Sequence, residues 1–260
     1  MSNGTVTDFQ VGAVLGRGLN ILAKNLVPFG LLSMILMSPP YLLVLAFGMD
    51  YSAAGPNLVV ATVAIILIVI LLYFLLSGAL IYGSIRELRG SRASLGECVR
   101  WGLSMLFPVV STAFVTSMGA FIGPVLIGVV GMAVIANPWI VAPPAIILGF
   151  VLFTRWWVAV AVAVVEHPGV IKSLRRSAKL TSGYRWRVFG ILITVILAQN
   201  ILDRAVSAIL SGAPSLLIVA SFLITAAATA YTAVVTAVCY HDLRILKEGV
   251  DVNDIARVFD

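Results

Sequence analysis

The chain has 260 residues, of which 61% are hydrophobic and 11% charged, and its mean hydropathy is +1.09. Soluble domains are about 45–50% apolar, so this composition excludes an ordinary soluble protein with a charged surface. The net charge of +6 does not indicate a nucleic-acid partner. The basic residues lie beside long apolar segments, where anionic lipid headgroups are the nearer partner.

Six long apolar segments predict membrane-spanning helices. A helix needs roughly 20 residues to cross the hydrocarbon layer, and the segments are continuous rather than alternating, which favours helices over a barrel. We therefore expect an all-α integral membrane protein in which six transmembrane helices form three hairpins. The expected spans are 26–48, 57–82, 106–135, 141–165, 188–210 and 215–240.

Basic residues fill every second gap between these segments. Of the 17 lysines and arginines, only Arg155 and Arg204 lie elsewhere. Cytoplasmic loops of membrane proteins carry an excess of lysine and arginine. The pattern therefore predicts that both termini and the even-numbered gaps face the cytoplasm.

The chain also repeats one design, an amphipathic helix followed by a hairpin. We place the units at about 8–82, 93–165 and 169–240, with a cytoplasmic tail at 241–260. Ser94 and Glu97 have the capping-box spacing that starts a helix, and Pro168 suits a first helical position. The expected apolar faces are Val11, Val14, Leu15, Leu19 and Leu22 in the first unit, and Ile171, Leu174 and Ala178 in the third.

Basic amphipathic helices of this kind lie in the headgroup plane of a membrane. Guanidinium groups suit phosphate because their geometry allows bidentate hydrogen bonds. The alternative interpretation is that the basic residues only connect the spans and fix their orientation. The candidates for binding lipid phosphate are Arg175, Arg176, Lys179, Arg86, Arg89 and Arg244.

Arg155 is the one basic residue expected deep within the membrane. At 1.5 Å per residue it lies roughly 16 Å from the inner end of its span, and arginine at such a depth costs at least ~2.5 kcal/mol. The expected partner is Asp203, together with Gln199 and Asn200 of the fifth span. A purely structural pair is the alternative to a functional one, and Asp203 could instead pair with Arg204 at the outer boundary.

The two histidines each stand beside an acidic residue, in Glu166-His167 and His241-Asp242. Both pairs are expected at the inner boundary, which raises the alternative of a metal site. Zinc requires three or four ligands in fixed geometry, and no spacing in the sequence supplies them. We therefore predict no metal and no cofactor, with helix capping or headgroup contact as the ordinary role of these residues.

Several stretches within residues 155–249 resemble a known membrane domain. These stretches are Arg155-Trp156, Val165-Glu166, 173–177, 180–183, Trp186, 239–244 and 247–249. They are similar to the membrane domain associated with some bacterial glycerophosphodiester phosphodiesterases and to related small uncharacterised membrane proteins. That family usually has tyrosine where this chain has His241.

The resemblance implies a polytopic protein of the bacterial cytoplasmic (inner) membrane. In the phosphodiesterases of that family, catalysis belongs to a separate barrel domain with metal ligands. The 260 residues contain no counterpart of that barrel, so the resemblance does not carry the enzymatic activity with it.

Together, these features predict a non-enzymatic membrane protein that binds anionic lipid headgroups or scaffolds a membrane partner, with a homo-oligomer as one possible assembly. The alternative is a small transporter or channel for a lipid-related or small anionic solute, using Arg155. A third hypothesis is an enzyme acting on lipid headgroups through Glu166, His167, His241 and Asp242. The sequence contains no nucleophile elbow and no phosphate-binding glycine loop, which disfavours the third hypothesis.

Overall fold

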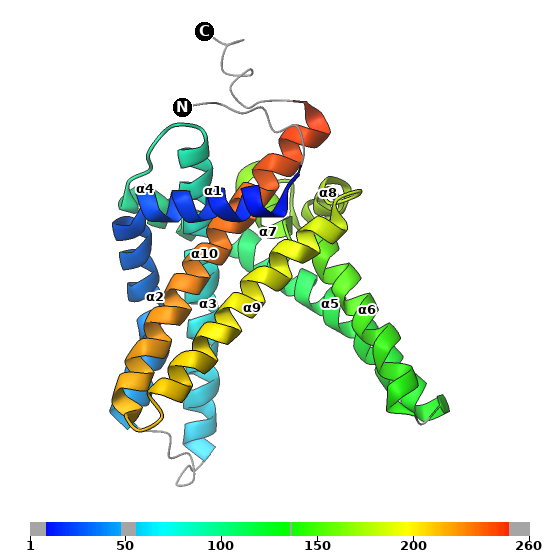
Figure 1. Cartoon of the computed structure of the whole chain (residues 1–260), viewed down its shortest axis with the longest axis horizontal. Coiled ribbons are helices and arrows are strands. Elements are labelled where there is room, and N and C mark those ends of the chain that lie inside the picture. The colour runs from blue at the N-terminus through cyan, green and yellow to red at the C-terminus, as the bar shows by residue number, and fades with distance from the viewer. Residues whose placement is uncertain (1–8, 48–55, 136, 250–260) are drawn as a thin grey trace. The chain divides into compact units, whose positions relative to one another are not determined.

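The computed structural model describes residues 9–47, 56–135 and 137–249, and all regular structure within these ranges is helical (Figure 1). Five of the helical segments are long and apolar enough to cross a membrane, or six if α1 and the start of α2, which meet at 87°, form one broken span. The all-helical class and the multi-pass character predicted from the sequence are thus confirmed. The helices are α1 Val11–Lys24, α2 Leu26–Phe47, α3 Pro56–Leu88, α4 Leu95–Ser104, α5 Leu106–Ile135, α6 Pro138–Trp156, α7 Ala159–Glu166, α8 Val170–Leu180, α9 Arg185–Ile209 and α10 Pro214–Glu248.

The last helix is longer than predicted. We expected the sixth span to end at residue 240 and a tail to follow, but α10 continues to Glu248. The intervening residues contain neither glycine nor proline, and Arg244 forms an ion pair with Glu248 one turn later. Gly249, with a φ of 64°, then ends the helix, because a left-handed residue after the last turn stops helical hydrogen bonding. Residues 250–260 of the expected tail lie outside the described residues.

The fourth predicted span consists of two helices. The break between α6 and α7 falls at Trp157 and Val158, inside an otherwise continuous apolar segment. The expectation that Pro168 begins the next helix was wrong, because α8 begins two residues later. His167 (φ 53°) and Gly169 (φ 87°) both have left-handed backbone angles, so the helix can start only after Gly169.

The chain forms two compact units. Unit 1 comprises Met1–Gly16, Phe107–Ile193 and Thr236–Asp260, and unit 2 comprises Arg17–Leu106 and Thr194–Val235. The long helices α9 and α10 each contribute residues to both units. The predicted three-unit repeat remains a prediction, since this division follows packing and not sequence similarity.

In unit 1, α5 and α6 run in opposite directions with glycines at their contact. A Cβ atom on Gly119 would lie 2.7 Å from the Trp156 ring, and one on Gly131 would lie 2.6 Å from Val141. Gly123 also faces α6, whereas Gly128 has no neighbour within 4 Å of such an atom. Gly119 and Gly123 therefore allow α5 and α6 to pack closely, as small residues do between membrane helices, whereas Gly128 lies away from this contact.

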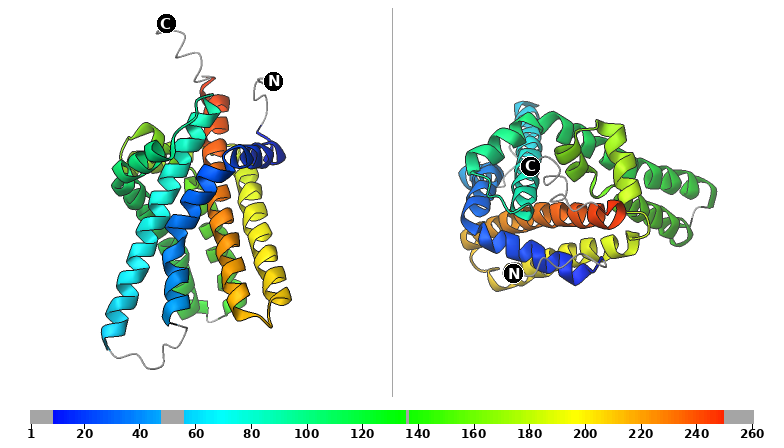
Figure 2. Two further views of the ribbon diagram at one scale, coloured as in Figure 1. Left: turned by 90° about the vertical axis from the view of Figure 1, so that its left-hand side faces the viewer. Right: turned by 90° about the horizontal axis from the view of Figure 1, so that it is seen from above.

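In unit 2, α3 packs against both α2 and α4 (Figure 2). The capping box that we predicted at the start of α4 is present, with Ser94 and Glu97 exchanging hydrogen bonds. The Tyr82 and Trp101 rings stack with centroids 4.7 Å apart, and Arg86 donates to the Tyr82 hydroxyl over 3.3 Å. The stacked rings hold α4 against the end of α3.

Large apolar side chains are exposed along the long helices. Phe107 is 81% exposed, Val134 78% and Ile209 78%. Soluble monomers rarely expose extensive apolar surfaces, and lipid requires the backbone hydrogen bonds to be satisfied within the helices. The exposed apolar surface therefore agrees with a membrane protein.

The expected apolar faces of α1 and α8 contain both buried and exposed side chains. In α1, Val14 is buried and Leu19 is 57% exposed. In α8, Leu174 and Ala178 are buried, while Ile171 is 56% exposed. The placement of these faces in the headgroup plane of a membrane stays a prediction.

Candidate functional site

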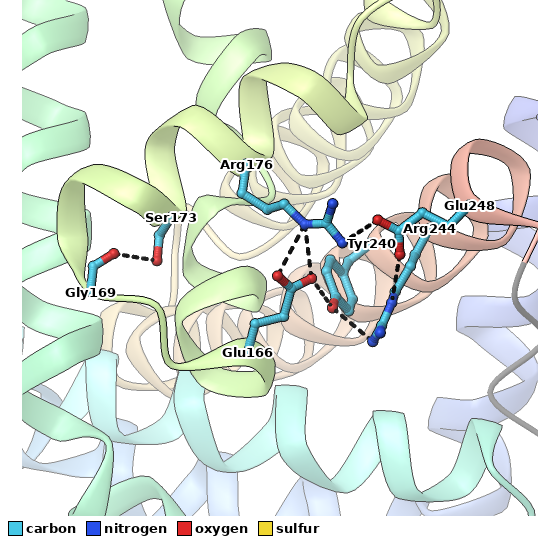
Figure 3. A network of polar contacts seen from close by, with 7 residues as sticks. All are labelled: Glu166, Gly169, Ser173, Arg176, Tyr240, Arg244 and Glu248. Atoms are coloured by element: carbon cyan, nitrogen blue, oxygen red, sulfur yellow. Dashed lines mark hydrogen bonds and ion pairs between the residues drawn. The ribbon is translucent and has the colours of Figure 1, made fainter. Parts of the chain in front are cut away.

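The most extensive side-chain network among the described residues of unit 1 centres on Arg176 of α8 (Figure 3). Its Nε donates to both carboxylate oxygens of Glu166, at 3.2 and 3.0 Å. Its Nη2 forms an ion pair with the Glu248 carboxylate of α10. The three side chains are only 21–25% exposed. One arginine thus joins the end of α7 to the end of α10.

Tyr240 and Arg244 complete the network from α10. The Tyr240 hydroxyl donates to Glu166 Oε1 over 2.7 Å, and Arg244 Nε donates to Glu248 Oε2 over 3.2 Å. Residues 240, 244 and 248 are one helical turn apart, so they lie on one face of α10. The network contains two arginines and two glutamates, so its formal charges cancel.

A sharp chain reversal brings Glu166 and Arg176 together. The left-handed His167 ends α7, and α8 starts after Gly169. Ser173 closes the first turn of α8 by donating to the Gly169 carbonyl over 2.9 Å. The reversal lets two side chains ten positions apart in sequence face each other (Figure 3).

Carboxylates on both sides stabilise the charged form of Arg176. Burial alone would lower the pKa of the guanidinium group, but the hydrogen bonds and charges of Glu248 and Glu166 raise it above its usual value. The positive charge of Arg176 is therefore retained and neutralised within the protein. This pairing gives Arg176 a partner that the sequence analysis did not identify.

The buried face of α8 binds the break between α6 and α7. Ser177 Oγ donates to the Arg155 carbonyl over 2.9 Å, and Thr181 Oγ1 lies 3.3 Å from the same oxygen. Both hydroxyl-bearing residues are fully buried. A helix that ends leaves backbone carbonyls without helical partners, and these two side chains satisfy the carbonyl of Arg155.

The side chain of Arg155 itself is exposed. Its predicted partner Asp203 is half-buried and belongs to unit 2, whereas Arg155 belongs to unit 1. Their pairing therefore stays a prediction. Of the amides expected beside Asp203, Gln199 is half-buried, and Asn200 is exposed and donates to the Ile196 carbonyl over 2.8 Å.

The residues of the alternative metal site do not assemble. Glu166 already accepts hydrogen bonds from Tyr240 and Arg176. His241 Nδ1 lies 3.6 Å from the buried carboxylate of Asp242. Across the described residues, no three histidine, cysteine, aspartate or glutamate side chains gather into a group that could hold a metal ion.

The remaining basic residues of α8 lie on its exposed face. Lys172, Arg175 and Lys179 are exposed, while Ser173, Ser177 and Leu180 are buried. We call these three cations the α8 basic face. Of the other predicted lipid-binding residues, Arg89 is exposed and Arg86 is half-buried.

Comparison with known proteins does not assign this chain to a family. No protein-family model, no curated protein and no solved structure matches it. The resemblance to the phosphodiesterase-associated membrane domain therefore stays a prediction.

Proposed function

We propose that this multi-pass membrane protein binds anionic lipid headgroups through the α8 basic face and that it catalyses no reaction. The observation that carries the proposal is the division of basic residues in α8. Arg176 is neutralised by Glu166 and Glu248, whereas Lys172, Arg175 and Lys179 are exposed. The charges available to an external anion are thus gathered on one side of the helix.

The spacing of the α8 basic face suits a negatively charged surface. Its members stand three and four positions apart, so they share one side of the helix. Each lysine or arginine near an anionic membrane contributes about 1 kcal/mol. The opposite side buries Leu174 and Ala178, which anchors the helix to the protein while its cations face outward.

The proposal includes the orientation indicated by the basic residues. In it, both termini face the cytoplasm of a bacterium, three hairpins cross the inner membrane, and the amphipathic helices α1, α4 and α8 lie at the cytoplasmic interface. Reporter fusions at residues near 90 and 180 test this arrangement. A reporter active only on the outer side at either position would contradict it.

The proposed relation to the phosphodiesterase-associated membrane domain is supported by where the resembling residues lie. Glu166, Arg176, Tyr240, Arg244 and Glu248 all belong to the stretches that carry the resemblance, and they form one network. We interpret the network as the structural centre that holds α8 in position. Under this interpretation, the lipid-binding residues are its exposed neighbours.

The test measures lipid enrichment around the intact protein. The protein is reconstituted in mixed phosphatidylglycerol and phosphatidylcholine membranes and extracted with a polymer that retains the surrounding lipid. Mass spectrometry then gives the ratio of the two lipids per protein. We expect phosphatidylglycerol to be enriched by the wild type, and the Lys172→Gln, Arg175→Gln, Lys179→Gln triple variant to return to the bulk ratio.

Arg176→Gln is the control for charge at a paired position, because it removes a positive charge from the same helix without altering the α8 basic face. We expect it to keep the lipid enrichment, since its guanidinium group is bound to Glu166 and Glu248. Unchanged enrichment in the triple variant would refute the assignment to the α8 basic face. If Arg176→Gln lost the enrichment while the α8 basic face was intact, lipid binding would not depend on whether a cation of α8 is exposed or paired.

A second candidate function, transport of a small anionic solute, has one observation in its favour. Arg155 lies in the last turn of α6, close to the break between α6 and α7, and interrupted spans frequently form substrate sites in transporters. Uptake of a labelled anion into proteoliposomes, compared between the wild type and Arg155→Gln, tests it. Equal uptake by protein-containing and empty liposomes would remove this candidate.

A further inference from the structure

An amphiphilic groove lies between α6 and α9 within unit 1. Its volume is about 330 Å³. Phe150 and Phe189 meet edge-on in it, with ring centroids 5.2 Å apart, and Trp186 lies 6.0 Å from Phe189. The groove is lined by Ile147, Phe150, Val151, Thr154, Arg185, Trp186 and Phe189.

The lining changes from apolar to polar along the groove. Ile147 and Val151 lie about two turns and one turn before Thr154 on α6. Phe189 lies one turn after Arg185 on α9. The polar ends coincide, because Thr181, in the connection that leads to Arg185, contacts the carbonyl of Arg155 next to Thr154. Among the described residues that line the groove, Arg185 is the only charged one, and it is exposed.

We infer that this groove binds one anionic phospholipid, with an acyl chain along the apolar side chains and the phosphate at Arg185. The apolar groove with a single cation at one end complements an amphiphilic molecule with an anionic headgroup. Guanidinium forms strong, charge-assisted hydrogen bonds with phosphate, and Trp186, 85% exposed, has the amphipathic ring that favours the headgroup level of a membrane.

The apolar walls support a lipid tail over a free phosphate ion. Ile147 is 62% exposed, Val151 43% and Phe150 42%, and each would gain from contact with hydrocarbon instead of water. An inorganic phosphate would use only Arg185 and leave these side chains uncovered. The inference deepens the proposed function and rests on it, because it assumes that the protein resides among anionic lipids.

The experiment titrates the full-length protein in detergent with dioleoyl phosphatidylglycerol or dioleoyl phosphatidylcholine, and native mass spectrometry follows the first bound lipid. Arg185→Gln should weaken phosphatidylglycerol binding by about tenfold, the equivalent of one charge-assisted hydrogen bond, and should weaken phosphatidylcholine binding less, because the choline group offsets the charge of its phosphate. Val151→Trp should weaken the binding of both lipids, because the indole fills the groove. Ile147→Trp, at a more exposed position, provides a second filling variant if Val151→Trp does not fold.

Matched controls lie on the same helix but outside the groove. Arg204→Gln removes an exposed arginine of α9, and Ile209→Trp places an indole at an exposed position near its other end. Both should bind the first phosphatidylglycerol molecule as the wild type does. The inference would be overturned if Arg185→Gln bound the first phosphatidylglycerol molecule as tightly as the wild type does. The same result in a folded Val151→Trp or Ile147→Trp variant would also overturn it.

The same titration separates this inference from the proposed function. If the α8 triple variant loses its preference for phosphatidylglycerol while the groove variants bind normally, the groove is refuted and the proposed function stands. If the groove variants lose the first lipid while the α8 triple variant keeps its preference for phosphatidylglycerol, the α8 assignment fails and the groove remains. Loss in both sets supports both conclusions.

Discussion

Arg175 and Arg176 are adjacent in the chain, but the first is exposed and the second binds two carboxylates inside unit 1. The helical turn of about 100° per residue produces this difference, because it directs successive side chains to different sides. Two residues of the same type therefore have separate roles. Arg175 contributes to the α8 basic face, and Arg176 joins α7 and α10.

The first prediction compares these two arginines. Arg176→Gln leaves the partly buried carboxylates of Glu166 and Glu248 without their common cation, so the loss of stability should be about 1–3 kcal/mol. Arg175→Gln should change stability by no more than about 0.5 kcal/mol, as is usual at the surface. Thermal unfolding in detergent measures both. Equal melting temperatures for the two variants would contradict the division of roles.

The second prediction concerns the carbonyl of Arg155. Ser177 and Thr181 both approach this oxygen, so Ser177→Ala or Thr181→Val alone leaves one hydroxyl available. The double variant removes both, and a partly buried carbonyl left without a partner costs about 1–3 kcal/mol. We therefore expect the loss in the double variant to exceed the sum of the single losses. A double-mutant cycle from thermal unfolding tests this, and additive losses would show that the two hydroxyls do not share a function.

The helical class and most of the span positions follow from the sequence, because long apolar segments leave few alternatives in a bilayer. The predicted span at 106–135 agrees with α5 (Leu106–Ile135) in both bounds. The capping box of Ser94 and Glu97 was also predictable, because it depends on residues close in sequence. Such features require no knowledge of tertiary packing.

The polar network could not be predicted in the same way. Glu166 and Tyr240 are 74 positions apart, and their hydrogen bond depends on how α7 and α10 pack. The left-handed angle of His167, which is uncommon for residues other than glycine, sets the reversal that aligns Arg176. The i, i+4 spacing of Arg244 and Glu248 was the one local signal, and it also indicates that α10 continues beyond residue 240.

The third prediction tests the contact between α5 and α6. A methyl group on Gly119 would lie 2.7 Å from the Trp156 ring, whereas one on Gly128 would meet nothing within 4 Å. Gly119→Ala should therefore destabilise the protein by about 1–3 kcal/mol through overpacking. Gly128→Ala should be neutral or stabilising by up to about 1 kcal/mol, since alanine favours a helix. Thermal unfolding of the two variants side by side distinguishes these effects, and equal shifts would argue against a close contact at Gly119.

The last prediction concerns the pH dependence that Cys98 introduces into unit 2. Its side chain is buried, and burial, assisted by the charge of Glu97, raises the pKa of the thiol to about 11. A thiol in the unfolded chain loses its proton near pH 8.5. The group therefore contributes fully to stability below that pH, and this contribution is lost as the pH rises from about 8.5 towards 11.

Cys98→Ser isolates this effect, because the hydroxyl is similar in shape and does not titrate in this range. We expect the difference in melting temperature between the wild type and Cys98→Ser to shift against the wild type as the pH is raised from about 8 to about 10. Other titrating groups affect both proteins equally, so they cancel in the difference. A difference that stays constant over this range would mean that the thiol ionises equally in the folded and unfolded states, and that burial does not control its pKa.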